Sequence, residues 1–322
     1  MGSVKWLVWA LTILQYILLY KIRMKPQTWL ITGATGLVGR ALTAHLVSLG
    51  QDVRTLGRGT EALPGTTSFS WNVTQGHLPL EAVQGADVVV HLAAASVGQR
   101  WTFGHRKAIL DSRVQGTQLL RQALLDSNFQ GTWIQASAVG LYGNTSSPCH
   151  EATPAGSGFL ADVAQSWERA IGPSEDRPFR VVTMRLGLVL SPKGGTLEKL
   201  LPIYRFGLGA PLGSGEQGMA WIHIDDVVAF TLWAAQHPQA EGPFNVVAPH
   251  SVNNVTFSST LAKVLNRPHW APSVPGFALR LAMGDMASLL LEGQIVVPQR
   301  LNEVGFMWQH PELQGALESC VG

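Results

Sequence analysis

One glycine-rich segment near the N-terminus constrains the fold most strongly. A short apolar strand over residues 28–32 leads into glycines at positions 33, 36 and 39, and an apolar-periodic helix over residues 37–49 follows. In this context the first glycine permits a sharp turn, the second lets the backbone approach a pyrophosphate, and the third lets the helix pack closely on the sheet. The spacing is G-x-x-G-x-x-G rather than the G-x-G-x-x-G of dehydrogenases. Strand, loop and helix together predict a dinucleotide phosphate site, with the helix N-terminus facing the anion.

Strand and helix patterns alternate through the first two thirds of the chain. This alternation predicts an α/β fold, a Rossmann-type doubly wound parallel sheet. Gly and Pro then become frequent over residues 191–220, and shorter, irregular elements follow. We therefore expect a Rossmann domain over residues 24–190 and a smaller substrate-side lobe over residues 191–322. The expected strands are 28–32, 52–56, 69–71, 87–92, 132–137 and 180–186, and the expected helices are 37–49, 103–127 and 157–171.

The segment before the first strand contains an uncharged apolar run over residues 6–20, preceded by Lys5 and followed by three cations. As a helix this run spans about 22 Å, less than the bilayer core of about 30 Å, although flanking residues extend it to 4–22. The excess of positive charge behind it predicts a single-pass membrane anchor within residues 1–23, with the C-terminal body in the cytoplasm. The alternative is that translation starts at Met24 and the protein is cytoplasmic.

Composition excludes some classes of partner. The formal net charge is only +2, so we expect no nucleic-acid partner. The two cysteines, Cys149 and Cys320, are far apart and have no companions at metal-ligand spacing. We therefore predict no metal site, and inert thiols in a reducing compartment.

Several motifs resemble those of one superfamily. Residues 32–39, 91–94 and 221–226 resemble the phosphate loop, the strand-four motif and a late F-I-H-V-D-D-like signature of the extended short-chain dehydrogenase/reductases, in the NAD(P)-dependent epimerase/dehydratase group. Residues 99–102, 111–113, 206–213 and 297–301 are similar to a poorly characterised "epimerase family" branch. That branch carries a C-terminal domain of unknown function, expected here at about residues 270–318, and some members are labelled cell-division-inhibitor-like.

The end of the second expected strand indicates which cofactor is used. NAD enzymes place an acid there for the ribose 2′-hydroxyl, whereas this strand ends Leu56-Gly57-Arg58. The Arg58 guanidinium can pair with a 2′-phosphate, and Arg40 can assist, although both are also ordinary positions for solvated charges. We predict NADP(H) in preference to NAD(H). The expected cofactor-binding residues are Gly33, Thr35, Gly36, Leu37, Val38, Gly39, Arg40, Arg58, Leu92, Ala93 and Ala94.

The resemblance implies a catalytic Ser with a Tyr and a Lys spaced Y-x-x-x-K, but the pair is missing. Phe159 and Val163 stand at the Tyr and Lys places, while Ser137 matches the family Ser. Tyr142 is the nearest phenol to Ser137, so we predict Ser137 and Tyr142 as the catalytic residues. The alternative for Tyr142 is a structural phenol.

Two further residues are candidates for substrate contact, and a third for a structural role. Arg100 lies just beyond the fourth strand, where it can meet an anionic substrate, and His223 lies at the expected junction of the lobes. The alternative for His223 is a satisfied, partly buried histidine. We expect Asp225 to cap the helix that follows.

Two hypotheses about function follow. The first is an NADP(H)-dependent epimerase or oxidoreductase acting on a small polar or nucleotide-linked carbonyl or alcohol. The second is an NADP(H)-binding regulatory or interaction module with reduced catalysis, linked to cell division through an unknown protein partner. The missing Tyr and Lys favour the second, and the retained Ser137 and His223 favour the first.

Overall fold

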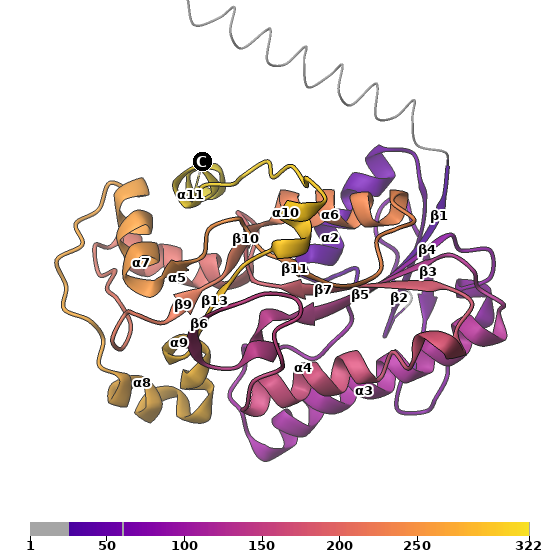
Figure 1. Cartoon of the computed structure of the whole chain (residues 1–322), viewed down its shortest axis with the longest axis horizontal. Helices are drawn as coiled ribbons and strands as arrows, with labels where there is room; N and C mark the ends of the chain where they lie inside the picture. The colour runs from indigo at the N-terminus through magenta and orange to yellow at the C-terminus, as the bar shows by residue number, and fades with distance from the viewer. Residues whose placement is uncertain (1–25, 60, 322) are drawn as a thin grey trace, which may run out of the picture.

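The computed structural model describes residues 26–59 and 61–321. Its centre is a seven-stranded sheet of order β11–β7–β5–β4–β1–β2–β3, in which every neighbouring pair is parallel (Figure 1). The strands are short and their inner members are almost fully buried, as expected of a sheet covered on both faces. They are β1 Thr28–Thr32, β2 Asp52–Gly57, β3 Thr67–Ser70, β4 Val88–His91, β5 Thr132–Ala138, β7 Arg180–Leu186 and β11 Gly242–Val246.

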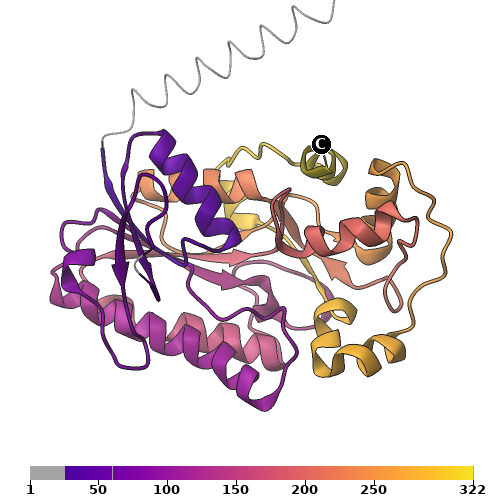
Figure 2. The same ribbon diagram turned by 180° about the vertical axis from the view of Figure 1, so that it is seen from behind.

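Two helical layers cover the sheet, and alternation along β1 explains why both are needed. Trp29 and Ile31 point to the face covered by α2 (Leu37–Ser48) and α6 (Ile224–Gln236). Leu30 points to the opposite face, in the core that α3 (Phe103–Asp126) helps to form. Helix α4 (Phe159–Arg169) packs beside α3, and Figures 1 and 2 show these two helices on one side of the sheet and α2 and α6 on the other. The doubly wound prediction is confirmed.

The last strand of the sheet comes from a part of the chain expected to lie outside it. Strand β11 pairs with β7 along its whole length, and α6 packs against α2. The sheet therefore continues past residue 190, although the division of the chain into two domains there stays a prediction. The chain leaves the central sheet after β7 and returns to it at β11. The order of elements along the sequence does not predict this return.

The smaller lobe has a core of its own. Helices α5 (Gly195–Arg205), α7 (Asn254–Val264) and α11 (Leu313–Val321) enclose a buried cluster that includes Leu197, Phe257, Leu261 and Leu317. Two two-stranded sheets pair strands from before and after residue 190: β10 Trp221–His223 with β8 Leu188–Leu190, and β13 Gln294–Val296 with β6 Thr145–Cys149. A third, β12 Val252–Asn253 with β9 Gly218–Met219, lies within the later part of the chain. Helices α8 Gly276–Met283 and α9 Ser288–Leu291 follow, and α10 Gln299–Glu303 packs against β11 of the central sheet.

The predicted membrane-anchored location needs correction. Across residues 26–59 and 61–321, no helix has both the length and the apolar character needed to cross a membrane. Residues 4–22, on which the prediction depended, lie outside the described residues.

Candidate functional site: the carboxyl edge of the parallel sheet

The three loop glycines are required for different reasons. A Cβ at Gly33, whose φ is +71°, would lie 2.8 Å from the backbone nitrogen of Ala93. A Cβ at Gly39 would lie 2.3 Å from the carbonyl oxygen of Gly33. A Cβ at Gly36 would meet only that same carbonyl oxygen, at 3.2 Å. Close packing of the protein thus requires Gly33 and Gly39, whereas Gly36 has the local space expected of a glycine that admits a pyrophosphate.

The N-terminus of α2 is prepared for an anion. Its N-cap is Gly36, which has no side chain to accept a hydrogen bond from the first-turn N–H groups. The first turn also contains no acidic residue, in contrast to helices whose N-termini are neutralised by carboxylates. Arg40, one turn into the helix, donates from Nε to the carbonyl oxygen of Thr35 at 2.7 Å and so braces the loop. These residues fit a dinucleotide phosphate group.

A buried hydrogen-bond network joins the phosphate loop to the segment after β4. Thr32 Oγ1 accepts from the backbone N–H groups of Leu92 and Ala93, each at 3.1 Å, and lies 2.6 Å from His91 Nδ1. Burial lowers the pKa of His91 to about 3, so its ring is neutral and Nδ1 accepts the Thr32 proton. The network fixes Leu92 and Ala93 beside Gly33, and the prediction that they line a cofactor stays a prediction.

The other predicted cofactor and substrate cations are exposed. Arg58 follows the end of β2, and within the described residues its guanidinium makes no hydrogen bond or ion pair. Arg100 lies in the segment after β4, also exposed. Because all strands are parallel, the residues after β1, β2 and β4 meet at one edge of the sheet. Leu37 of that edge is contacted from the smaller lobe, since Cβ atoms at Gly194 and Gly195 would lie 3.2 and 3.0 Å from its methyl groups.

Ser137 and Tyr142 lie at the same edge but in a closed network. Ser137 Oγ donates to Glu168 Oε1 at 2.6 Å, and the Tyr142 hydroxyl donates to Asn245 Oδ1 at 2.6 Å. Both side chains are buried, and burial raises the pKa of the Tyr142 phenol. Each hydroxyl proton is therefore already donated to a protein acceptor. The catalytic roles of these two residues stay predictions.

Arg185 on β7 is the centre of this network, and sequence reasoning missed it. It forms a two-pronged ion pair with Glu168 of α4, with Nε–Oε1 and Nη2–Oε2 distances of 2.9 Å. Its Nη1 donates to the Tyr142 hydroxyl at 3.0 Å and to the carbonyl oxygen of Glu151 at 2.9 Å. We refer to Ser137, Tyr142, Glu168, Arg185 and Asn245 as the Arg185 network. A charge inside an apolar strand was its one signal in the sequence.

Helix α4 carries the two departures from the family pattern. The Phe159 ring packs against Trp101, with ring centroids 4.9 Å apart, and the Arg106 guanidinium lies 4.3 Å from its centroid. Arg106 also pairs with Asp285 of the smaller lobe at 3.0 Å. Val163 is buried. The place of the family's Tyr is thus held by a phenyl ring, packed against an indole and a guanidinium, which has no hydroxyl group to transfer a proton.

His223 caps α6, a role that was expected of Asp225. Its Nδ1 accepts from the backbone N–H of Asp225 at 3.2 Å, and its Nε2 lies 3.1 Å from Ser319 Oγ. Because both ring nitrogens have protein partners, the geometry favours the satisfied, buried histidine over a substrate contact. The His223 ring also stacks against His310, with centroids 3.8 Å apart.

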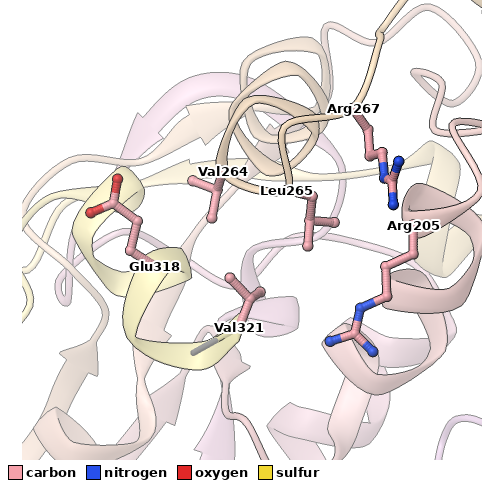
Figure 3. Close-up of a pocket in the computed structure, with 6 residues that line it drawn as sticks. All are labelled: Arg205, Val264, Leu265, Arg267, Glu318 and Val321. Carbon is pink, nitrogen blue, oxygen red and sulfur yellow. The ribbon is translucent and has the colours of Figure 1, made fainter.

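A cavity of about 510 Å³ lies in the smaller lobe, away from the glycine loop (Figure 3). It opens between the ends of α5, α7 and α11. Figure 3 shows the Arg205 and Arg267 guanidinium groups on one side of it and Glu318 on the other. None of the predicted site residues lines this cavity, so we assign it no part in cofactor binding.

Comparisons with known proteins agree with this geometry. A model of the NAD dependent epimerase/dehydratase family matches residues 29–248, and a model of a domain of unknown function, DUF1731, matches residues 274–320. The chain is 38% identical over 291 residues to Epimerase family protein Mb2239 of Mycobacterium bovis, an alignment that covers 89% of this chain and 95% of the relative.

Solved structures lead to the same family. The structure of human epimerase family protein SDR39U1 with NADPH is 32% identical and has a TM-score of 0.81, covering 91% of this chain and 98% of that chain. MoeE5 in complex with UDP-glucose and NAD, 21% identical with a TM-score of 0.73, covers 91% of this chain and 97% of its own and shares the fold. With the glycine loop, the parallel sheet and the family match in agreement, this chain belongs to the NAD-dependent epimerase/dehydratase family.

Proposed function

We propose that this protein binds NADP(H) in preference to NAD(H) and acts on a small polar or nucleotide-linked carbonyl or alcohol as an oxidoreductase or epimerase. One observation carries the cofactor preference. Strand β2 ends in Gly57-Arg58 with an exposed guanidinium and without the carboxylate that would bind a ribose 2′-hydroxyl. The relative SDR39U1, whose structure was determined with NADPH, supports the same cofactor.

Different residues at the sheet edge would bind different parts of the cofactor and the substrate. The N-terminus of α2 would hold the pyrophosphate, and Arg58 would pair with the 2′-phosphate. Leu92, Ala93 and Ala94 would line the dinucleotide, and Arg100 would meet an anionic substrate. A bound nicotinamide supplies the hydride chemistry.

Cofactor titration tests this proposal directly. NADPH should bind more tightly than NADH, and Arg58→Ala should lower NADPH affinity by about 10–100-fold, the loss of one charged hydrogen bond. Affinity for NADH should stay the same, because NADH has no 2′-phosphate. Arg169→Ala, which removes an exposed arginine from α4, is the matched control. Equal affinity of the parent protein for the two cofactors would contradict the proposal.

A second function is favoured by the closed Arg185 network and by Phe159 and Val163. A protein that binds NADP(H) without turnover would act as a regulatory or interaction module. Screening carbonyl compounds for loss of NADPH absorbance separates the two functions. If Ser137 transfers a proton, Ser137→Ala should cost about 10²–10⁴-fold in rate while NADPH affinity is unchanged. A module would show no turnover on any compound, and its partner binding would depend on NADPH.

A further inference from the structure

Two histidines from distant parts of the chain meet one carboxylate outside the cofactor edge. His223 ends β10, Asp225 lies in the first turn of α6, and His310 lies in the segment between α10 and α11. That segment runs over α6, on the same side of the sheet as α2 (Figure 1). Asp225 Oδ2 is 3.5 Å from His223 Nδ1 and 3.6 Å from His310 Nε2.

We propose that His223, Asp225 and His310 form a binding site for a divalent transition-metal ion, for which Zn²⁺ is the best fit. One ligand atom from each residue lies within 4.8 Å of the other two. A tetrahedral ion with bonds of about 2.0–2.1 Å places its ligands about 3.3–3.4 Å apart, close to the two separations that involve Asp225. Two imidazoles and a carboxylate suit Zn²⁺ rather than Ca²⁺ or Mg²⁺, which prefer all-oxygen sites.

The hydrogen bonding of His223 suits a metal ligand. Its Nε2–H points to Ser319 Oγ at 3.1 Å, which leaves the Nδ1 lone pair on the side of Asp225. A metal-binding histidine usually donates its second nitrogen in this way, which fixes the ring's tautomer and orientation. An ion at Nδ1 would displace the long 3.2 Å bond from the Asp225 N–H, which is the side-chain cap of α6.

The position of His310 is fixed by a buried carboxylate. Asp226, fully buried, accepts from the backbone N–H groups of Gln309 at 2.6 Å and His310 at 3.1 Å. Trp308 donates from Nε1 to the carbonyl oxygen of Val247 at 3.0 Å and holds the same segment. The backbone that carries His310 is therefore held in place by the fold before any ion binds.

The local charge and the exposure of the ligands are also suitable for binding a cation. The N-terminal dipole of α6 disfavours a cation, but Asp225 and Asp226 both lie in that first turn and outweigh its half charge. The Asp225 side chain is 57% exposed and that of His310 is 22% exposed, so an ion can enter and a water can take the fourth position.

Metal binding to the full chain, prepared without a histidine tag, tests the proposal. Isothermal titration with Zn²⁺ should give one site per chain, and Co²⁺ at that site should show the visible absorption of a tetrahedral complex. Zn²⁺ should also raise the thermal unfolding temperature, because it binds the native state. Failure of the wild-type chain to bind one ion, or an octahedral Co²⁺ spectrum, would overturn the proposal.

Variants at half-buried and exposed positions locate the ion without disturbing the core. Ser319→Ala, which removes the group that orients His223, should lower Zn²⁺ affinity about 10–100-fold. His310→Ala and Asp225→Ala each remove a ligand and should lower it further. His77→Ala, which removes an exposed histidine elsewhere, should leave affinity unchanged. If His310→Ala binds Zn²⁺ as tightly as the wild type, the ion binds elsewhere. If the two histidines only stack on each other, neither the wild type nor any variant should bind Zn²⁺ at this position.

Discussion

The phosphate loop and the Arg185 network lie at the same edge of one parallel sheet, yet they differ in whether their polar groups are paired within the protein. At the loop, the first-turn N–H groups of α2 have no side-chain cap and Arg58 is exposed. In the Arg185 network, each hydroxyl proton and both oxygens of Glu168 have protein partners. One region presents its polar groups outward, and the other uses them to hold α4, β5, β7 and β11 together.

The difference separates binding from catalysis. A polar group that is paired inside the protein contributes to stability, whereas one left at a helix N-terminus needs water or a ligand as its partner. The N-terminus of α2 thus fits a dinucleotide phosphate, whereas Ser137 and Tyr142 are hydrogen-bonded within the protein and their catalytic roles stay predictions. A family match across both regions does not distinguish these two uses, because it records residue types and not their partners.

The largest effects should come from the loop glycines, and they should differ in kind. Gly39→Val should prevent folding, because its Cβ would overlap the Gly33 carbonyl oxygen. Gly36→Val should fold but lose NADPH binding by more than about 100-fold, or roughly 2.7 kcal/mol. Circular dichroism and cofactor titration on both variants test this contrast. Normal NADPH binding by Gly36→Val would show that the pyrophosphate does not approach this glycine.

The next largest effect concerns the Arg185 network. Glu168→Ala leaves the buried Arg185 without its carboxylate and should lower the free energy of unfolding by about 3–5 kcal/mol. The control is Asp285→Ala, which breaks the exposed pair with Arg106 and should cost about 0–1 kcal/mol. Urea denaturation measures both. Similar losses in the two variants would mean that the network is not the structural centre described above.

The smallest effect appears only in mild acid and concerns the loop region. The unfolded chain protonates His91 below about pH 6.5, but the folded protein does so only near pH 3. The unfolded state therefore binds more protons in this window, and His91 makes stability fall as the pH drops from 6.5 toward 3, with no contribution above 6.5.

Urea denaturation between pH 7 and pH 5 should reveal this contribution as a slope. In His91→Gln the unfolding free energy should fall less steeply as the pH drops. The slope should be smaller by up to about 1.4 kcal/mol per pH unit, because one proton fewer is taken up on unfolding. The exposed His77→Gln should leave the slope close to that of the wild type. Parallel slopes for the wild type and His91→Gln would refute the burial argument.

Local patterns predicted most of the sheet. Strands β1 and β7 match their expected bounds, and α2, α3 and strands β2 to β5 differ by a few residues at their ends, whereas the short strands β6 and β8 were not predicted. Such elements follow from apolar periodicity and glycine positions within short windows. One cap was wrong, because His223 rather than Asp225 caps α6. Capping depends on backbone direction at one residue, which a pattern does not specify.

The sequence by itself determined the family, the doubly wound sheet and the phosphate loop, because each depends on residues that are neighbours along the chain. Only the tertiary structure decided that β11 completes the sheet, that Arg185 contacts Tyr142 directly and Ser137 through Glu168, and that His310 reaches Asp225. These are contacts between distant segments, formed when packing of the core fixes where strands and loops end. The residue type determines which interactions a side chain can make, and its neighbours in the folded chain determine which of them it makes.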